Sequence, residues 1–160
     1  NELLEVIPME KKLKIGVFGA RRGCGIAQGL TLTDKAYISA VCDYDESTYD
    51  NIKPFCCDET KYFKDFDEFL EQDLDAVVIA NYFHEHTPFA IKCFEKNIHV
   101  FSECTANGTM GDGVKLVRAF EKSKSINIVL ATIIKCIWFV GVCFLMYYVL
   151  KFLVATNSFK

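Results

Sequence analysis

A glycine- and arginine-rich turn near the start of the chain could receive a phosphate group. It reads Gly-Ala-Arg-Arg-Gly-Cys-Gly over residues 19–25 and follows a short apolar run, 13–18. At a turn from a strand into a helix, backbone N–H groups and the helix dipole stabilise anions. A G-x-G-x-x-G pattern from Gly19 would place glycine where Arg21 and Cys24 stand, so a plain glycine-rich turn is the alternative. The residues predicted to bind phosphate are Gly19, Ala20, Arg21, Arg22 and Gly23.

An aspartate after the next apolar run could bind a ribose. Residues 37–42 predict a second strand, and Asp43 follows it at about the distance expected for the carboxylate that accepts hydrogen bonds from the adenosine ribose of a dinucleotide. A carboxylate there repels a 2′-phosphate, which favours NAD over NADP. Arg21 and Arg22 argue for caution, because their charges suit a phosphate. The alternative interpretation of Asp43 is an exposed aspartate at a strand end.

Two later turns carry polar side chains directly after buried strands. The apolar runs 75–80 and 98–101 predict strands covered on both faces. Asn81 and His86 lie in the turn after the first run, and Glu103 lies in the turn after the second. Because ligands bind at the carboxyl ends of the strands in such sheets, we predict that these three residues face the same site as the glycine-rich turn.

The elements needed to position these residues alternate along the chain. Strands followed by helices at this spacing predict parallel pairing, hence an α/β fold with a doubly wound parallel sheet of Rossmann type. The predicted domains are an N-terminal extension (1–11), a dinucleotide-binding domain (12–131) and an apolar C-terminal tail (132–160). Strands are predicted at 13–18, 37–42, 75–80, 98–101 and 126–131, and helices after residue 25, within 44–59, and at 65–70, 88–96 and 108–124.

The order of these turns resembles the Gfo/Idh/MocA family of NAD(P)-dependent oxidoreductases, typified by glucose-fructose oxidoreductase and inositol dehydrogenase. The resemblance covers roughly residues 12–131, which corresponds to the family's N-terminal nucleotide domain. It implies that His86, rather than the less secure match His84, is the family's histidine on the nicotinamide side. It also implies that Glu103 is the glutamate of the family's Glu-Lys-Pro turn.

The same turn departs from the family pattern at Cys104, which stands where the family has a lysine that usually assists catalysis. A cysteine replaces neither the charge nor the reach of lysine. A redox or nucleophilic role for Cys104 is the weaker alternative to an inert thiol, because no base is assigned to it. We therefore assign no catalytic residue.

Composition narrows the partners and the compartment. The net charge is -3 with acidic and basic residues mixed, which provides no basic surface for nucleic acid. None of the eight cysteines forms a C-x-x-C pair, so no metal site is predicted. Several cysteines lie in apolar strand or helix patterns, where a thiol behaves as a small hydrophobe, and this favours a reducing compartment such as the cytosol.

The tail leaves several hypotheses open. Residues 133–155 are apolar except for Lys135 and Lys151. As a helix they would extend about 34 Å, enough for a bilayer core of about 30 Å, with the Rossmann domain on the cytosolic side. The rival hypothesis, which we favour, is that intron read-through or a frameshift replaced the natural sequence. A buried core helix is the third.

Two functions are compatible with these residues. The first is a truncated nucleotide-binding domain whose complete form oxidises a hydroxyl group of a sugar- or polyol-like substrate with NAD(P). One nucleotide domain cannot hold the substrate carbon against the nicotinamide, so this chain by itself is expected to bind the cofactor without turnover. The alternative is a catalytically silent NAD(P)-binding module, tethered to a membrane if the tail is genuine. The oligomeric state is not predicted.

Overall fold

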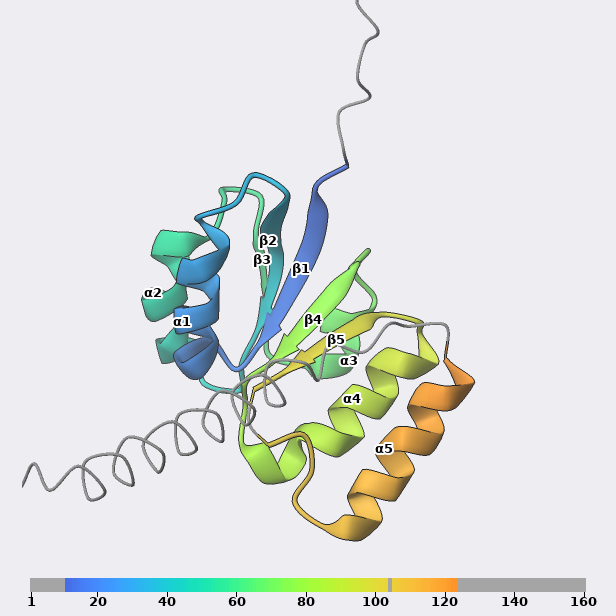
Figure 1. The fold of residues 1–160 in the computed structure, drawn as a ribbon. Helices are drawn as coiled ribbons and strands as arrows, with labels where there is room; N and C mark the ends of the chain where they lie inside the picture. Colours follow the sequence, from blue (N-terminus) through green and yellow to red (C-terminus); the bar gives the residue numbers. More distant parts are fainter. Residues whose placement is uncertain (1–10, 104, 124–160) are drawn as a thin grey trace, which may run out of the picture.

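The computed structural model describes residues 11–103 and 105–123 and contains one parallel sheet of five strands (Figure 1). The strand order is β3-β2-β1-β4-β5. This arrangement confirms the predicted doubly wound α/β fold. The strands are β1 (Leu13–Phe18), β2 (Ala36–Cys42), β3 (Lys61–Phe63), β4 (Ala76–Ile79) and β5 (His99–Ser102).

Helices cover both faces of the sheet (Figure 1). On one face lie α1 (Ala20–Leu30) and α2 (Tyr49–Ile52), and on the other lie α3 (Phe66–Leu70), α4 (His86–Glu95) and α5 (Met110–Lys122). Short 3-10 turns complete the connections: η1 (Glu46–Thr48), η2 (Lys53–Phe55) and η3 (Phe83–Glu85). Right-handed crossovers between parallel strands place the helices in this way.

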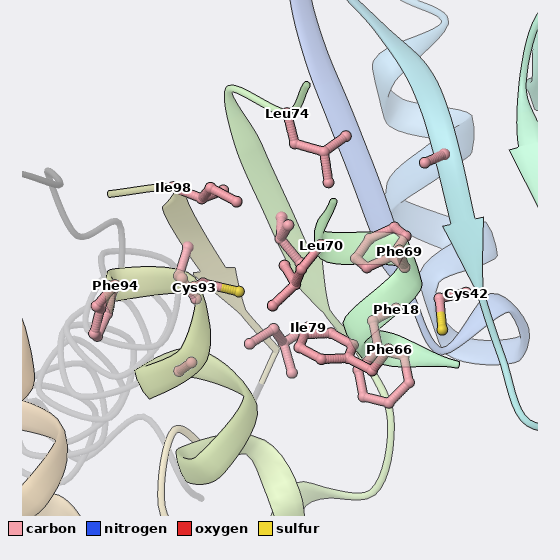
Figure 2. Packing of buried hydrophobic residues seen from close by; sticks show 14 of the residues in the cluster. Phe18, Cys42, Phe66, Phe69, Leu70, Leu74, Ile79, Cys93, Phe94 and Ile98 are labelled. Carbon is pink, nitrogen blue, oxygen red and sulfur yellow. The ribbon is translucent and has the colours of Figure 1, made fainter. Parts of the chain in front are cut away.

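The alternation of side chains along β1 divides the core in two. Ile15 and Val17 pack with residues of α1 and α2, whereas Phe18 faces α3 and α4. Figure 2 shows the aromatic cluster around Phe18 on the side of α3 and α4. In this cluster the centroids of the Phe18 and Phe66 rings lie 4.6 Å apart. These two layers hold the carboxyl ends of the strands rigidly in place.

Two cysteines belong to the aromatic cluster of Figure 2. Cys42 and Cys93 are fully buried, and burial raises the pKa of each thiol to about 12. Both thiols therefore stay protonated near neutral pH. They pack as small hydrophobes, as the sequence indicated, and the cysteines that the structure describes are free.

The structure differs from the predicted elements in three respects. Helix α1 begins at Ala20, so it includes most of residues 19–25, which were predicted as a turn before the helix. Strand β3 was not predicted, because three residues carry no detectable periodicity and only their pairing with β2 makes them a strand. Helix α4 begins at His86 instead of Pro88. Pro88 falls in the first helical turn, where its missing N–H leaves no bond unmade.

Some predictions fall outside the described residues. These are the strand at 126–131, the tail at 132–160 and nearly all of the extension at 1–11. Among the helices of residues 11–103 and 105–123, none combines the length and the apolar character that crossing a membrane requires.

We expect Gly23→Ala to destabilise the protein by about 1–3 kcal/mol, because α1 packs directly on β1 at this position. A Cβ atom at Gly23 would lie 2.4 Å from Cγ1 of Val17, a fully buried side chain that is stiff at χ1. Urea unfolding measures the change. Val17→Ala should cost less in the Gly23→Ala background than alone. A Gly23→Ala protein as stable as the parent would contradict this packing, since alanine intrinsically favours helices.

Candidate functional site

The strand order reverses direction at β1, since the chain first builds β2 and β3 on one side and then β4 and β5 on the other. The connections after β1 and β4 consequently leave toward opposite faces of the sheet (Figure 1). Such a switch point opens a crevice at the carboxyl ends of the strands, where doubly wound sheets bind ligands. Gly19, Asp43, Asn81 and Glu103 each follow one of these strand ends, so the fold brings the predicted residues to one edge.

Gly19 makes the turn from β1 into α1 in a conformation that favours glycine. Its φ is 94°, in the left-handed region, and a Cβ atom would lie 2.5 Å from the carbonyl carbon of Ala80 and from the nitrogen of Asn81. The turn is thus pressed against the end of β4. No side chain at this position separates the first turn of α1 from the crevice.

The backbone donors of the first turn of α1 can be counted individually. Ala20 donates its N–H to Oδ2 of Asp43 at 2.8 Å, and Gly23 donates to the carbonyl of Gly19 at 2.8 Å. Within the described residues, the N–H groups of Arg21 and Arg22 have no acceptor. Two neighbouring donors therefore remain at the positive end of the helix, which is the arrangement that binds phosphate.

Asp43 serves as a structural acceptor in addition to its predicted role. Its Oδ2 accepts the N–H of Ala20, the first residue of α1, from the segment that follows β2. Its other oxygen, Oδ1, accepts the N–H of Asp45 at 3.0 Å. A carboxylate has about four lone-pair sites, so Asp43 retains the capacity to accept ribose hydroxyls.

The two arginines of the turn interact with different segments. Hydrogen bonds from Ser47 lower the pKa of the Asp45 carboxyl, and the charge of Arg21 adds to this effect, so Arg21 interacts electrostatically with a residue that follows β2. Arg22 reaches toward β5, where its Nη1 lies 3.7 Å from Oε2 of Glu103. Arg21 thus acts on the segment after β2, where the ribose is predicted to bind, and the Arg22 side chain extends to the turn after β5.

His86 is fully buried and holds the two later turns together. Its Nε2 lies 3.1 Å from the carbonyl oxygen of Asn81, and its Nδ1 lies 2.9 Å from the carbonyl oxygen of Thr105 and 3.0 Å from Oγ of Ser102. Its partners thus come from the segments after β4 and β5. The less secure match, His84, is exposed. A direct contact between His86 and nicotinamide stays a prediction.

Two buried oxygens lie at the ends of β4 and β5 without a hydrogen-bond donor among the described residues. These are Oδ1 of Asn81 and Oε2 of Glu103. The amide nitrogen of Asn81 is engaged, since it donates to Glu85 at 3.0 Å. Buried acceptors without donors are unfavourable, so this end of the crevice suits a ligand that brings N–H or O–H groups. The carboxamide of nicotinamide and the hydroxyls of the ribose attached to it carry such groups. The neighbouring Cys104 lies outside the described residues.

Sequence reasoning named candidate residues that the structure brings to the carboxyl ends of the strands, but it did not give their connections. It missed the role of Asp43 as the acceptor for the Ala20 N–H, the burial of His86 and the partners Ser102 and Thr105. His86 lies between Glu85 and Thr87, two polar residues, so the sequence around it gives no signal of its burial.

A switch point in the strand order, a glycine turn with two open N–H donors and an acidic residue after β2 are together typical of a dinucleotide-binding Rossmann domain. The chain belongs to the Gfo/Idh/MocA family, described as an oxidoreductase family with an NAD-binding Rossmann fold, and the family match covers residues 13–130. The resemblance inferred from the sequence is therefore confirmed.

Known dehydrogenases share this domain. Myo-inositol 2-dehydrogenase of Thermotoga maritima is 30% identical over 122 residues, which are 75% of this chain and 35% of that protein. The crystal structure of a probable dehydrogenase from Thermotoga maritima has a TM-score of 0.66 and 29% identity, over 72% of this chain and 35% of the other. Myo-inositol dehydrogenase from Lactobacillus casei, solved with NAD(H) and myo-inositol, has a TM-score of 0.66 and 23% identity, over 72% and 35%. This chain thus spans about a third of the length of these proteins.

Proposed function

We propose that this chain is the nucleotide-binding part of an NAD-dependent oxidoreductase that acts on a hydroxyl group of a polyol or sugar-like substrate. The observation that carries the proposal is the pair of open N–H donors at Arg21 and Arg22, next to the Asp43 carboxylate, at the switch point of the sheet. These groups are suited to a diphosphate and a ribose that are joined in one molecule.

The residues divide the cofactor among them. We assign the pyrophosphate to the turn from Gly19 to Gly23 and the adenosine ribose to Asp43. Asn81 and Glu103 accept hydrogen bonds from the nicotinamide half, and His86 lies beside them. The cofactor supplies the hydride acceptor when bound, and the residues of this chain bind and orient it.

We favour NAD over NADP. Asp43 and Asp45 both follow β2, where we assign the adenosine ribose, and the charges of their carboxylates would repel a 2′-phosphate there. Arg21 offsets part of that repulsion, so the preference is expected to be moderate rather than absolute.

The substrate class rests on the relatives. The relative that is 30% identical is a myo-inositol 2-dehydrogenase, and the match covers 35% of that protein. We assign the residues that clamp the substrate to the remaining length of such proteins, which this chain does not match. We therefore expect residues 1–160 alone to bind NADH without oxidising a polyol.

The alternative function is a catalytically silent NAD-binding module. Cys104 favours it, because this position lacks the lysine that the family resemblance implies. Tethering through residues 132–160 would be a further property of such a module. NADH binding with no dehydrogenase activity on a panel of polyols, measured on the longest natural product of the gene, would support this alternative. Turnover would support the enzyme.

Substitution of Asp43 tests the binding mode. We expect Asp43→Ala to weaken NADH binding roughly ten-fold or more and to lower the free energy of unfolding by about 1 kcal/mol, because both the ribose and the Ala20 N–H lose an acceptor. NADPH should be affected less, since the repulsion of its phosphate is removed. NADH and NADPH fluorescence titrations and urea unfolding measure these changes.

Asp34→Ala is the matched control, because Asp34 is exposed in the turn between α1 and β2. This turn lies at the amino-terminal ends of the strands, away from the candidate site. It should leave both affinities unchanged. Asp43→Asn separates the two roles of the aspartate, since it keeps an acceptor for the backbone and removes the charge. If Asp43→Ala binds NADH as tightly as the parent chain does, the proposed binding mode is wrong.

A further inference from the structure

Arg22 contacts both ends of the proposed cofactor site. Its backbone N–H is one of the two open donors in the first turn of α1, and its side chain extends to Glu103 beyond the end of β5. These two groups of Arg22 would meet different halves of a dinucleotide. The N–H lies where we assign the diphosphate, and Glu103 lies at the end that we assign to nicotinamide. Arg22 is therefore the residue through which one half can influence the other.

The contact between Arg22 and Glu103 is electrostatic and loose. The distance of 3.7 Å from Nη1 to Oε2 is too long for a hydrogen bond, and Oε2 accepts none from the described residues although it is buried. The Arg22 side chain is 66% exposed, whereas that of Glu103 is 28% exposed. An exposed guanidinium on a long side chain can change partners at little cost, because surface ion pairs are weak.

A diphosphate at the N-terminus of α1 offers Arg22 a stronger partner. Guanidinium groups bind phosphate oxygens in a bidentate manner that the present contact with Glu103 lacks. We propose that Arg22 is a shared cation that pairs with Glu103 in the absence of cofactor and moves to the diphosphate when it binds. This inference rests on the proposed function. It makes Arg22 a positioning residue for Glu103.

The transfer has a consequence for both ends of the site. While Arg22 pairs with Glu103, the glutamate competes with the diphosphate for the same cation and weakens its binding. Once the diphosphate holds Arg22, Glu103 loses its only nearby cation among the described residues and becomes available to donors of the nicotinamide half. Coupling of this kind is reciprocal, so each half of the cofactor should strengthen the binding of the other.

ADP isolates the competition, because it carries the adenosine ribose and the diphosphate but does not reach Glu103. We would measure ADP binding to the full 160-residue chain by calorimetry for the parent, Glu103→Gln, Arg22→Gln and the double variant. Glu103→Gln should bind ADP about two- to five-fold more tightly, the range that an exposed ion pair supports. Arg22→Gln should bind it more weakly, and the double variant should match Arg22→Gln.

NADH binding serves as the second readout, because Glu103→Gln should change the NADH affinity differently from the ADP affinity. Because NADH reaches Glu103, the gain that Glu103→Gln gives with ADP should disappear or reverse with NADH. Arg22→Lys retains a cation and should keep most of the ADP affinity. Unchanged ADP affinity in Glu103→Gln, or an equal gain in the Arg22→Gln background, would overturn the shared-cation proposal while NADH binding by the parent still supports the proposed function. If the parent binds neither ADP nor NADH, the proposed function fails and this inference fails with it.

Discussion

Gly19→Val is expected to abolish NADH binding and to lower the free energy of unfolding by about 3 kcal/mol or more. Two effects add at this position. The backbone has a φ of 94°, which is strained for a β-branched residue, and the new Cβ would lie 2.5 Å from backbone atoms of Ala80 and Asn81. Backbone atoms at the end of a central strand cannot move aside without disturbing the sheet. The turn must therefore shift, and the open donors of α1 shift with it.

The measurements are urea unfolding and an NADH titration, with Gly25→Ala as the matched control in the same helix. A Cβ at Gly25 would meet no atom within 4 Å, so only helix propensity changes there. We expect Gly25→Ala to gain up to about 1 kcal/mol of stability and to bind NADH normally. A Gly19→Val protein that binds NADH like the parent would show that the turn does not approach β4 as described.

His86→Ala is expected to lower the free energy of unfolding by about 3 kcal/mol, the second large effect. The ring is fully buried, so its removal leaves a cavity and takes hydrogen-bond partners from Asn81, Ser102 and Thr105. A buried polar group that loses its partner is more unfavourable than the bond it made was favourable. NADH binding should weaken as well, because the turns after β4 and β5 lose their connection.

His84→Ala is the control for His86→Ala, because it removes a histidine that does not connect the two turns. His84 lies two residues away and its side chain is 61% exposed, so its removal should change the free energy of unfolding by no more than about 0.5 kcal/mol. Thermal and urea unfolding of the two variants, measured side by side, provide the comparison. Similar values for both histidines would mean that the buried ring does not stabilise the fold.

Much of the fold could be predicted because its central strands are long apolar runs. Strands β1, β2 and β4 are buried on both faces, and each run coincides with a strand to within a residue or two. The short edge strand β3 could not be predicted in this way. Its three residues form a strand only because β2 offers them a partner, and such pairing is a property of the assembled sheet.

The positions of the candidate site residues at the strand ends could be predicted, but the contacts between them could not. The glycine-rich turn departs from the G-x-G-x-x-G pattern, and the structure shows what two of its glycines do. Gly19 provides the turn, and the close contact of helix and strand falls on Gly23 against Val17. Gly25 has no such contact, although the sequence gives no sign of the difference. Contacts between residues distant in the sequence decide which glycines matter.

The hydrogen bond from the Ala20 N–H to Asp43 limits how cofactor preference can change in this lineage. The simplest route to NADP is to replace the acidic residue, but here that replacement also removes the acceptor that holds the start of α1. Replacement of Asp43 by a residue without an acceptor would therefore reduce stability while it removed the charge that repels a 2′-phosphate. Asparagine at residue 43 removes the same charge and keeps an acceptor for the Ala20 N–H, so it is the replacement that avoids this loss. Fold stability thus restricts the replacements that can alter the proposed NAD preference to those that keep an acceptor for the Ala20 N–H.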